Sequence, residues 1–341
     1  MIQFKKSTLE STYDVMFYDS ICMVFNDEII LNQGMGGSEF VIWQIANEMG
    51  QRGLRVLINQ SNNTSDDYTN GNVTYKFGQI DRKITVTNLV HHRLSDTNYE
   101  HNISWIDRSI LCTDLWGEHY KKIYKIVDKS KVICVSQWHK NQFPSDWNPI
   151  FISNPLPDYC YAQSNMARDP RSFIYASAAL KGLKNTIIVW KYLKDNYSVL
   201  KDAKLKVFNP GYENSSIQNS YEDYGIEFHG SLPFAKILKE FQTSAGLFYI
   251  NDFPETFCIV AALAEASGAR VHCLMRNGGA ISETVNSKLV TDSLDIFIKE
   301  FLFFYKSETS NNSFNPKNYR VKSIVDQWFA HFQINFFSEK K

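Results

Sequence analysis

The stretch PETFCIVAALAEASGARV, from Pro254 to Val271, is predicted to form a turn, a short helix and the start of a strand. Pro254 begins the turn, and Gly268 is the kind of glycine that commonly ends a helix. Two carboxylates lie in this stretch, Glu255 at the mouth of the helix and Glu265 near its end. They are either a pair that binds one ligand, or a helix start and a solvated helix face.

The stretch belongs to a repeating pattern of strand, helix and strand. It lies between the predicted strands AGLFYIND and ARVHCLM, and this order is the unit of a parallel α/β sheet. The N-terminal part shows the same unit, with DVMFYDS and RVLINQ as strands around the helix SEFVIWQIANEMGQRG. Ser38 is the predicted N-cap of that helix and Gly53 its C-terminal signal. Between the two series lies NPLPDYCYAQSNMARDP, a polar stretch with three prolines, so we predict a two-domain α/β protein.

The composition narrows the class of protein. The 341 residues include 36 basic and 36 acidic side chains, 44% apolar residues and six cysteines. Balanced charge argues against a broad nucleic-acid-binding face, because a phosphate backbone requires clustered positive charge. The spacing of the cysteines suggests neither a zinc site nor a disulfide framework, and no stretch reads as a signal peptide or membrane span. We expect a globular cytoplasmic protein, soluble or bound peripherally to a membrane.

The first candidate binding motif is GMGGSE, from Gly34 to Glu39, which follows a predicted strand and begins a helix. Glycines let a ligand approach the backbone, and the free amides at a helix start attract an anion such as a diphosphate. The alternative is a tight turn from strand to helix without a ligand. The pattern alone does not separate these two interpretations.

Two further candidates lie at the ends of predicted strands. Lys181, in ALKGLKN, is either a point charge that meets a phosphate or an exposed loop residue. A helix that begins just after Pro254 is expected to point backbone amides toward a ligand, those of Thr256, Phe257 and Cys258. Open α/β sheets bind their ligands at the carboxyl ends of strands, where all of these motifs are predicted to lie.

The order and spacing of several segments resemble the family 4 glycosyltransferases of GT-B fold over nearly the whole chain. These segments are GGSE, VICVSQWHKNQF, SNPLPDYCY, FIYASAALKGLKN, IEFHGSLPFAKILKEF, FPETFCIVAALAEASGARV and NGGAISETV. The resemblance implies two Rossmann-like domains that face a cleft, and a C-terminal helix that crosses back onto the N-terminal domain. We place the acceptor-side domain at 1–156, the donor-side domain at 157–318 and the crossover helix at 319–341.

The resemblance also implies roles for individual residues. Gly36 and Gly37 would approach the donor sugar and its diphosphate, and Lys181, followed by Gly182, would bind a phosphate. Glu255 would hold hydroxyls of the donor sugar, next to the donor-binding segment of Thr256, Phe257 and Cys258. The implied donor is a UDP- or GDP-linked sugar, and neither a metal nor another cofactor is required.

One position departs from the family pattern. Members usually carry a second carboxylate eight positions after the first, which binds the ribose of the nucleotide, and here that position is Leu263. Glu265 is the nearest carboxylate, but two residues along an α-helix turn a side chain by about 200°. Glu265 is therefore predicted to be a solvated or structural position. The arginine that many members carry before the lysine is also absent from SAALK.

The N-terminal domain supplies weaker candidates. Asp114 is a further catalytic candidate, and the acceptor-side candidates are His91, His92, Arg93 and His119. A histidine near a strand end is more often structural than catalytic. The lysine-rich segment YKKIYKIVDKSK is predicted to be a solvated helix face, with acceptor or membrane binding as the alternative.

Three functions are compatible with these motifs. The first is a retaining glycosyltransferase that moves a sugar from a nucleotide-diphosphate sugar to a glycan, a lipid-linked or a protein-linked acceptor. The second is a weak or inactive protein of the same fold that binds a glycan or nucleotide sugar, since fold alone does not establish activity. The third is another GT-B chemistry, such as nucleotide-sugar epimerisation. The expected partners are a nucleotide sugar and a carbohydrate-bearing acceptor, and not a nucleic acid.

Overall fold

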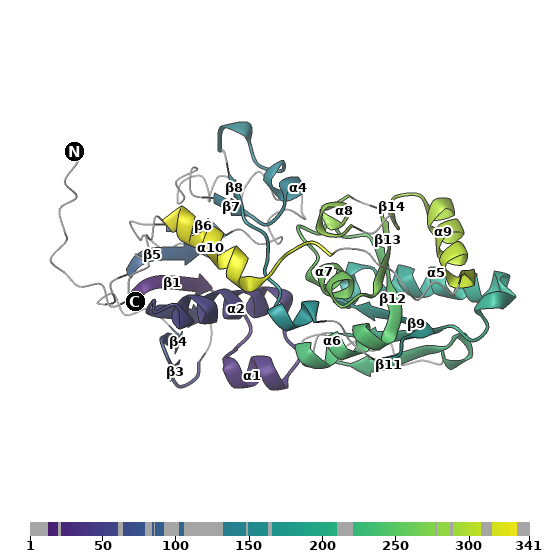
Figure 1. The fold of residues 1–341 in the computed structure, drawn as a ribbon, viewed down its shortest axis with the longest axis horizontal. Coiled ribbons are helices and arrows are strands. Elements are labelled where there is room, and N and C mark those ends of the chain that lie inside the picture. The colour runs from purple at the N-terminus through teal and green to yellow at the C-terminus, as the bar shows by residue number, and fades with distance from the viewer. Residues whose placement is uncertain are drawn as a thin grey trace.

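The computed structural model shows an elongated molecule with two α/β parts side by side (Figure 1). It describes residues 13–19, 22–60, 64–78, 84, 86–91, 102–105, 132–147, 149–162, 166–209, 221–276, 278–286, 289–307 and 316–332. Among these residues, the strands form two separate sheets, one in each part.

The sheet of the N-terminal part has the order β3-β4-β2-β1-β5-β6-β7-β8 among the described residues. Its strands pair in parallel, except that β3 and β4 are antiparallel. Their bounds are β1 Tyr13–Asp19, β2 Val56–Gln60, β3 Tyr68–Asn70, β4 Val73–Phe77, β5 Val86–His91, β6 Asn102–Trp105, β7 Val132–Cys134 and β8 Ile150–Phe151. The last five residues of β1 and all of β2 are buried, as expected for central strands covered on both faces.

The sheet of the C-terminal part has the order β11-β10-β9-β12-β13-β14, and all its described pairs are parallel. Its strands are β9 Asp169–Ala176, β10 Lys204–Phe208, β11 Ile226–Gly230, β12 Ser244–Asn251, β13 Arg270–Met275 and β14 Val290–Thr291. All eight residues of β12 are buried, which fits its central place in the sheet.

Helices cover both faces of the C-terminal sheet. On one face lie α5 (Leu183–Asn196) and α9 (Leu294–Lys306), whose Trp190 and Phe301 both contact the ring of Phe248 in β12. On the other face α6 (Phe234–Thr243) packs against α7 (Ile259–Ala266). The sheet is therefore the middle of three layers, and its carboxyl ends face the N-terminal part.

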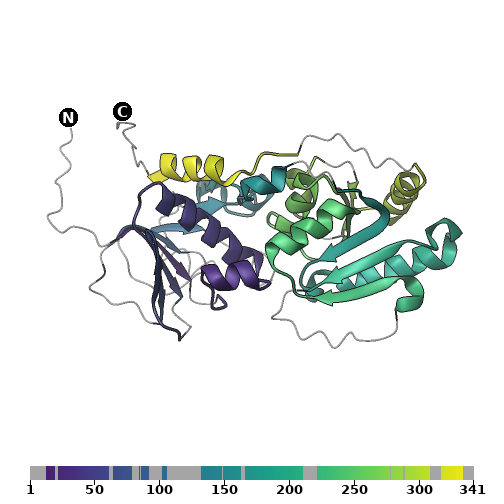
Figure 2. The same cartoon turned by 60° about the horizontal axis from the view of Figure 1, so that its bottom comes forward.

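Helices also connect and cover the N-terminal part. Helix α2 (Gly37–Gln51) follows β1 and packs against α10 (Val321–Phe332), which crosses back from the C-terminal part (Figure 2). Trp328 of α10 contacts the ring of Phe17 in β1 at 6.2 Å, and Arg52 pairs with Asp326. The short helices are α1 Asp27–Asn32, α4 Gln137–Lys140 and α8 Ile281–Thr284. The predicted fold class is confirmed, whereas the predicted domain limits at 156 and 318 stay predictions.

Two predicted helix starts are wrong. Helix α2 begins at Gly37 with Gly36 as N-cap, so Ser38 lies in the first turn and is not the cap. Helix α7 begins at Ile259 rather than just after Pro254. The reason is that Glu255 forms a β-bridge with Gly279, which holds the preceding segment out of the helix.

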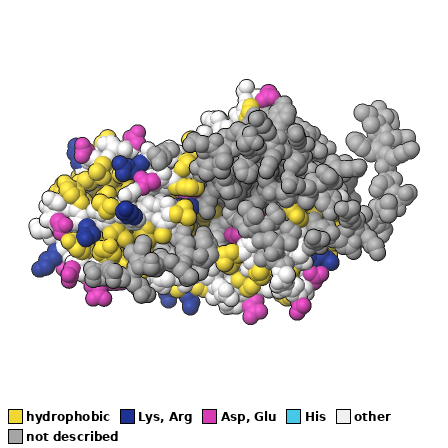
Figure 3. Space-filling model, turned by 180° about the vertical axis from the view of Figure 1, so that it is seen from behind, with side chains coloured by type: hydrophobic (Ala, Val, Ile, Leu, Met, Phe, Trp, Pro, Cys, Tyr) yellow, Lys and Arg dark blue, Asp and Glu magenta, His cyan; other side chains and the backbone are white. Residues whose placement is uncertain are grey.

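On the side of the molecule opposite to Figure 1, hydrophobic and basic side chains are interspersed over the C-terminal part (Figure 3). In the portions of the chain that the structure describes, none of the helices has the length and apolar character needed to cross a bilayer.

Candidate active site between the two domains

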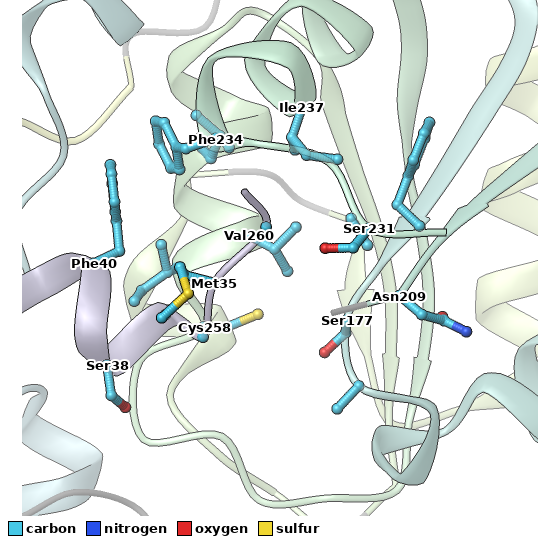
Figure 4. Close-up of a pocket in the computed structure, with 18 of the residues that line it drawn as sticks. Met35, Ser38, Phe40, Ser177, Asn209, Ser231, Phe234, Ile237, Cys258 and Val260 are labelled. Carbon is cyan, nitrogen blue, oxygen red and sulfur yellow. The ribbon is translucent and has the colours of Figure 1, made fainter. Parts of the chain in front are cut away.

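A cavity of about 200 Å³ lies between the two domains, at the carboxyl ends of β9, β10 and β11. Figure 4 shows Met35 and Phe40 of the N-terminal domain across from Ser177 and Ser231 of the C-terminal domain. Ligands of open α/β sheets bind at this edge, because the loops that follow the strands are free to shape a site there. The cavity is thus the place where a ligand would touch both domains.

Most of the predicted donor-site residues meet in this cavity. They line it from three separate parts of the chain: Gly36, Gly37, Lys181, Glu255, Thr256, Phe257, Cys258 and Leu263. Gly182 is the exception, because it does not line the cavity. Among the described lining residues, Lys181 and Glu255 are the charged ones.

Lys181 and Glu255 form a buried ion pair. The Nζ of Lys181 donates to Oε1 of Glu255 at 2.7 Å, and the two residues are 6% and 4% exposed. Tyr249 donates its hydroxyl to the same oxygen at 3.2 Å. The alternative of an exposed loop lysine is therefore wrong, and the pair places one positive and one negative charge side by side at the cavity wall.

Gly182 shapes the backbone next to Lys181. Its φ of 113° lies in the left-handed region, and a Cβ there would lie 2.0 Å from the carbonyl oxygen of Ile250. Only glycine fits this approach between the start of α5 and strand β12. Gly182 therefore allows the backbone next to Lys181 to pack closely against β12. It does not line the cavity itself.

The segment from Glu255 to Cys258 is held from two sides. The amide of Ala280 donates to the carbonyl of Glu255 at 2.7 Å, and Thr284 donates its hydroxyl to the carbonyl of Phe257. Cys258, the N-cap of α7, has a φ of 70°, a conformation that costs a non-glycine residue free energy. The start of α7 follows Cys258 at the cavity, which Ile259 and Val260 line, although it comes about one turn later than predicted.

The start of α2 also lies at the cavity, which Gly36, Gly37 and Ser38 line. Its N-cap, Gly36, makes no side-chain hydrogen bond to the helix. The first amides of an α-helix have no partner within the helix and carry its positive dipole end. A Cβ on Gly37 would lie 2.8 Å from Cδ1 of Ile259, so glycine lets the starts of α2 and α7 come close together.

The domains are in contact around the cavity. Phe40 of α2 stacks on Phe234 of α6, with ring centroids 4.0 Å apart. The amide of Trp138 donates to Glu283 of α8 at 3.0 Å. The two domains therefore contact each other at more than one point.

Leu263 and Glu265 lie on opposite sides of α7, as the helical rotation predicts. Leu263 is 2% exposed and lines the cavity. Glu265 is also 2% exposed, and its Oε1 accepts a hydrogen bond from the amide of Asn286 at 2.7 Å. The prediction of a structural position is confirmed, whereas the alternative of a solvated helix face is wrong. Glu255 and Glu265 therefore do not bind one ligand together. Glu255 pairs with Lys181 instead.

The acceptor-side candidates are mostly outside the described residues. His91 ends strand β5, at the edge of the N-terminal sheet that faces the C-terminal domain. His92, Arg93, Asp114 and His119 lie outside the ranges that the structure describes. Their roles stay predictions.

Several cavity residues were not predicted. Ser177, Asn209 and Ser231 follow β9, β10 and β11, and Asn154 lies between β8 and the C-terminal domain. Each comes directly or almost directly after a strand, which is the one signal that would have selected them. Tyr249, which donates to Glu255 from outside the cavity lining, was not predictable either, because it lies within an apolar strand and has the pattern of a core residue.

Solved structures share this architecture, whereas the sequence comparisons find no match. No protein-family model and no curated protein sequence matches the chain. Among solved structures, AviGT4, a glycosyltransferase involved in avilamycin A biosynthesis, aligns with a TM-score of 0.62 at 11% identity, covering 94% of this chain and 97% of that chain. HepE from Anabaena, solved in complex with UDP and glucose, gives 0.60 at 13% identity over 94% and 99%. WaaG, a glycosyltransferase involved in lipopolysaccharide biosynthesis, gives 0.57 at 10% identity over 94% and 95%.

These likenesses show the fold. The chain has the GT-B fold, with two Rossmann-like domains that face a cleft and a C-terminal helix that crosses back. The cavity with Lys181 and Glu255 lies in that cleft.

Proposed function

We propose that this protein is a retaining glycosyltransferase that uses a nucleotide-diphosphate sugar as donor. The buried pair of Lys181 and Glu255 carries the proposal, because it stands in an interdomain cavity next to the starts of two helices. A cation and the positive dipole ends of two helices suit a diphosphate, and a carboxylate suits the hydroxyls of a sugar. The fold of the similar glycosyltransferases supports the same conclusion.

The proposed reaction breaks the bond between the sugar carbon and the phosphate oxygen, and the electron pair leaves with the diphosphate. Lys181 and the amides at the starts of α2 and α7 stabilise the charge on that leaving group. An acceptor hydroxyl forms the new bond to the sugar carbon on the face that the diphosphate leaves. The proton of that hydroxyl passes to a phosphate oxygen of the leaving group, so no protein base is required.

Glu255 is proposed to orient the sugar. Its Oε1 is shared by Lys181 and Tyr249, which fixes the carboxylate in one position before a donor arrives. A fixed carboxylate lowers the cost of ordering the sugar in the transition state. When the diphosphate binds, Lys181 is placed to contact both the phosphate and Glu255.

The donor is proposed to carry UDP or GDP, and the acceptor a carbohydrate on a glycan, lipid or protein. HepE, which shares the fold, is known with UDP and glucose bound. Independence of metal, a cytoplasmic location and peripheral contact with a membrane are further parts of the proposal. Donor hydrolysis that persists after treatment with a chelator would support the metal-independent reaction.

A second candidate function is supported by Leu263. This apolar residue lines the cavity where the resemblance implies a ribose-binding carboxylate, and the described lining contains one cation. With fewer polar contacts to the donor than the resemblance implies, the protein would bind a nucleotide sugar but transfer its sugar slowly or not at all.

The test is a panel of UDP- and GDP-linked sugars, incubated with the protein and candidate acceptors. We expect donor hydrolysis or transfer that falls at least about 100-fold in Glu255→Ala and in Lys181→Ala, since both act on the charge of the transition state. Asp202→Asn, on a side chain that is 70% exposed and outside the cavity, is the control. Binding without turnover would favour the second candidate, and no stabilisation by any nucleotide at millimolar concentration would contradict both.

A further inference from the structure

The side-chain oxygen of Asn154 is buried in the cavity wall and has no partner among the described residues. Asn154 is 8% exposed and lies in the segment that joins the two domains. Its Oδ1 is fully buried and accepts no hydrogen bond from the described residues, although Asn154 lines the cavity. Buried polar atoms in folded proteins are nearly always hydrogen-bonded, so an unpaired amide at a cavity points to a ligand as the missing partner.

Contacts of the neighbouring residues show which end of the cavity Asn154 occupies. Gln44 of α2 donates to the carbonyl of Pro155 at 3.4 Å. The amide of Leu156 donates to the carbonyl of Tyr319 at 2.7 Å, and the ring of Tyr319 meets that of Phe257 at 4.9 Å. The joining segment therefore runs between α2 and the segment that carries Glu255. Asn154 lies at the end where the transferred sugar is proposed to bind.

Ser231 is a second cavity residue with a buried polar atom. Its Oγ has no partner among the described residues, and Figure 4 shows this hydroxyl pointing into the cavity. Ser231 follows β11, whose Gly230 accepts a hydrogen bond from the amide of Asn209 at 3.1 Å. Ser231 thus belongs to the wall of β10 and β11, and it lies against Gly34, where an added Cβ would clash with its Oγ.

We infer that the amide of Asn154 binds a hydroxyl of the sugar carried by the donor, an inference that rests on the proposed function. An amide has both donor and acceptor atoms, and a hydroxyl both donates and accepts. The contact therefore forms whichever way the amide is turned. A free nucleotide lacks this hydroxyl at that end of the cavity, so Asn154 distinguishes a nucleotide sugar from its nucleotide.

The test compares affinities for UDP, UDP-glucose, GDP and GDP-mannose by calorimetric titration of the full chain. We expect Asn154→Leu to weaken binding of the nucleotide sugar by about 3- to 10-fold, the effect of one hydrogen bond, and to change binding of the matching nucleotide by less than about twofold. A ratio of these two affinities that falls in Ser231→Ala and not in Asn154→Leu would assign the sugar hydroxyl to Ser231 and overturn the inference. Asn154→Ala serves as a second variant if Asn154→Leu does not fold.

A matched control is Asn59→Leu. Asn59, in β2, is also a buried amide whose oxygen has no partner among the described residues, but it does not line the cavity. It should leave the ratio unchanged. An equal loss for nucleotide and nucleotide sugar in Asn154→Leu, or no loss for either, overturns the inference while the proposed function stands. If the unaltered protein binds none of the four ligands, the proposed function itself fails, and the inference with it.

Discussion

The Nζ of Lys181 lies 2.7 Å from Oε1 of Glu255, although the two residues are 74 positions apart in the chain. Lys181 ends the turn after β9, and Glu255 follows β12, the neighbour of β9 in the sheet. Parallel neighbouring strands end at the same edge, which is why residues so distant in sequence meet there. The ion pair is therefore a product of strand order.

Breaking this pair on one side is expected to destabilise the protein. Lys181→Met leaves a buried carboxylate unpaired, and Glu255→Leu leaves a buried cation, so each should lower the free energy of unfolding by about 3–5 kcal/mol. The double variant should lose less than either single variant, because no unpaired charge remains. Urea unfolding followed by circular dichroism measures all three.

The control for that cycle is the exposed pair of Arg171 and Asp202, with side chains 58% and 70% exposed. Its removal should change the free energy of unfolding by less than about 1 kcal/mol, since solvent screens exposed charges. Additive losses for Lys181 and Glu255 would show that the buried pair is not coupled.

Gly182→Ala is expected to be more damaging than Gly53→Ala. Both glycines have positive φ, 113° and 93°, but the added Cβ at Gly182 would meet the carbonyl of Ile250 at 2.0 Å, whereas nothing lies within 4 Å at Gly53. We expect a loss of about 1–2 kcal/mol at Gly53 from the backbone conformation alone, and a larger one at Gly182. Equal shifts of the denaturation midpoint would refute the clash at Ile250.

The left-handed conformation of Cys258 reverses the usual preference between glycine and alanine. At a φ of 70°, we expect Cys258→Gly to be more stable than Cys258→Ala by about 1 kcal/mol. Cys134, in strand β7, is the control, and there Cys134→Ala should be the more stable variant. Chemical denaturation of the four variants measures both differences, and the same sign at both positions would contradict the prediction.

His272 is expected to make the protein less stable in acid. It packs against Phe173, Phe301 and Phe304, and both ring nitrogens are buried without a partner among the described residues. Burial lowers the pKa of His272 well below its ordinary value, and the charge of Arg270 lowers that pKa further. The unfolded chain, with a histidine pKa of about 6.5, therefore binds a proton that the folded chain does not.

Because the unfolded state gains this proton, the free energy of unfolding should fall as pH drops below about 6.5, by up to about 1.4 kcal/mol per pH unit. His272→Leu should flatten that dependence when unfolding is measured between pH 7 and pH 5. Phe297→Leu, which removes a buried ring but no titratable group, is the control and should leave the slope unchanged. A slope that survives in His272→Leu would assign the acid sensitivity to other groups.

Much of the architecture was predictable from local patterns. Apolar runs and terminal glycines indicated α2, α7 and the parallel strands before and after each of them. The helical rotation correctly placed Leu263 and Glu265 on different sides of α7. These features depend on a few neighbouring residues, and the physical rules for such segments are local.

The sequence by itself determined that the chain folds as two α/β domains, since each apolar stripe and run must be buried against a neighbouring element. It also determined several of the residues that stand at strand ends and line the site, Lys181 and Glu255 among them. Only the tertiary structure decided that Glu255 pairs with Lys181, that Glu265 is buried against Asn286, and that the Oδ1 of Asn154 has no partner among the described residues at the cavity. Those relationships depend on which strands are neighbours and how closely the domains approach, and long-range packing decides both.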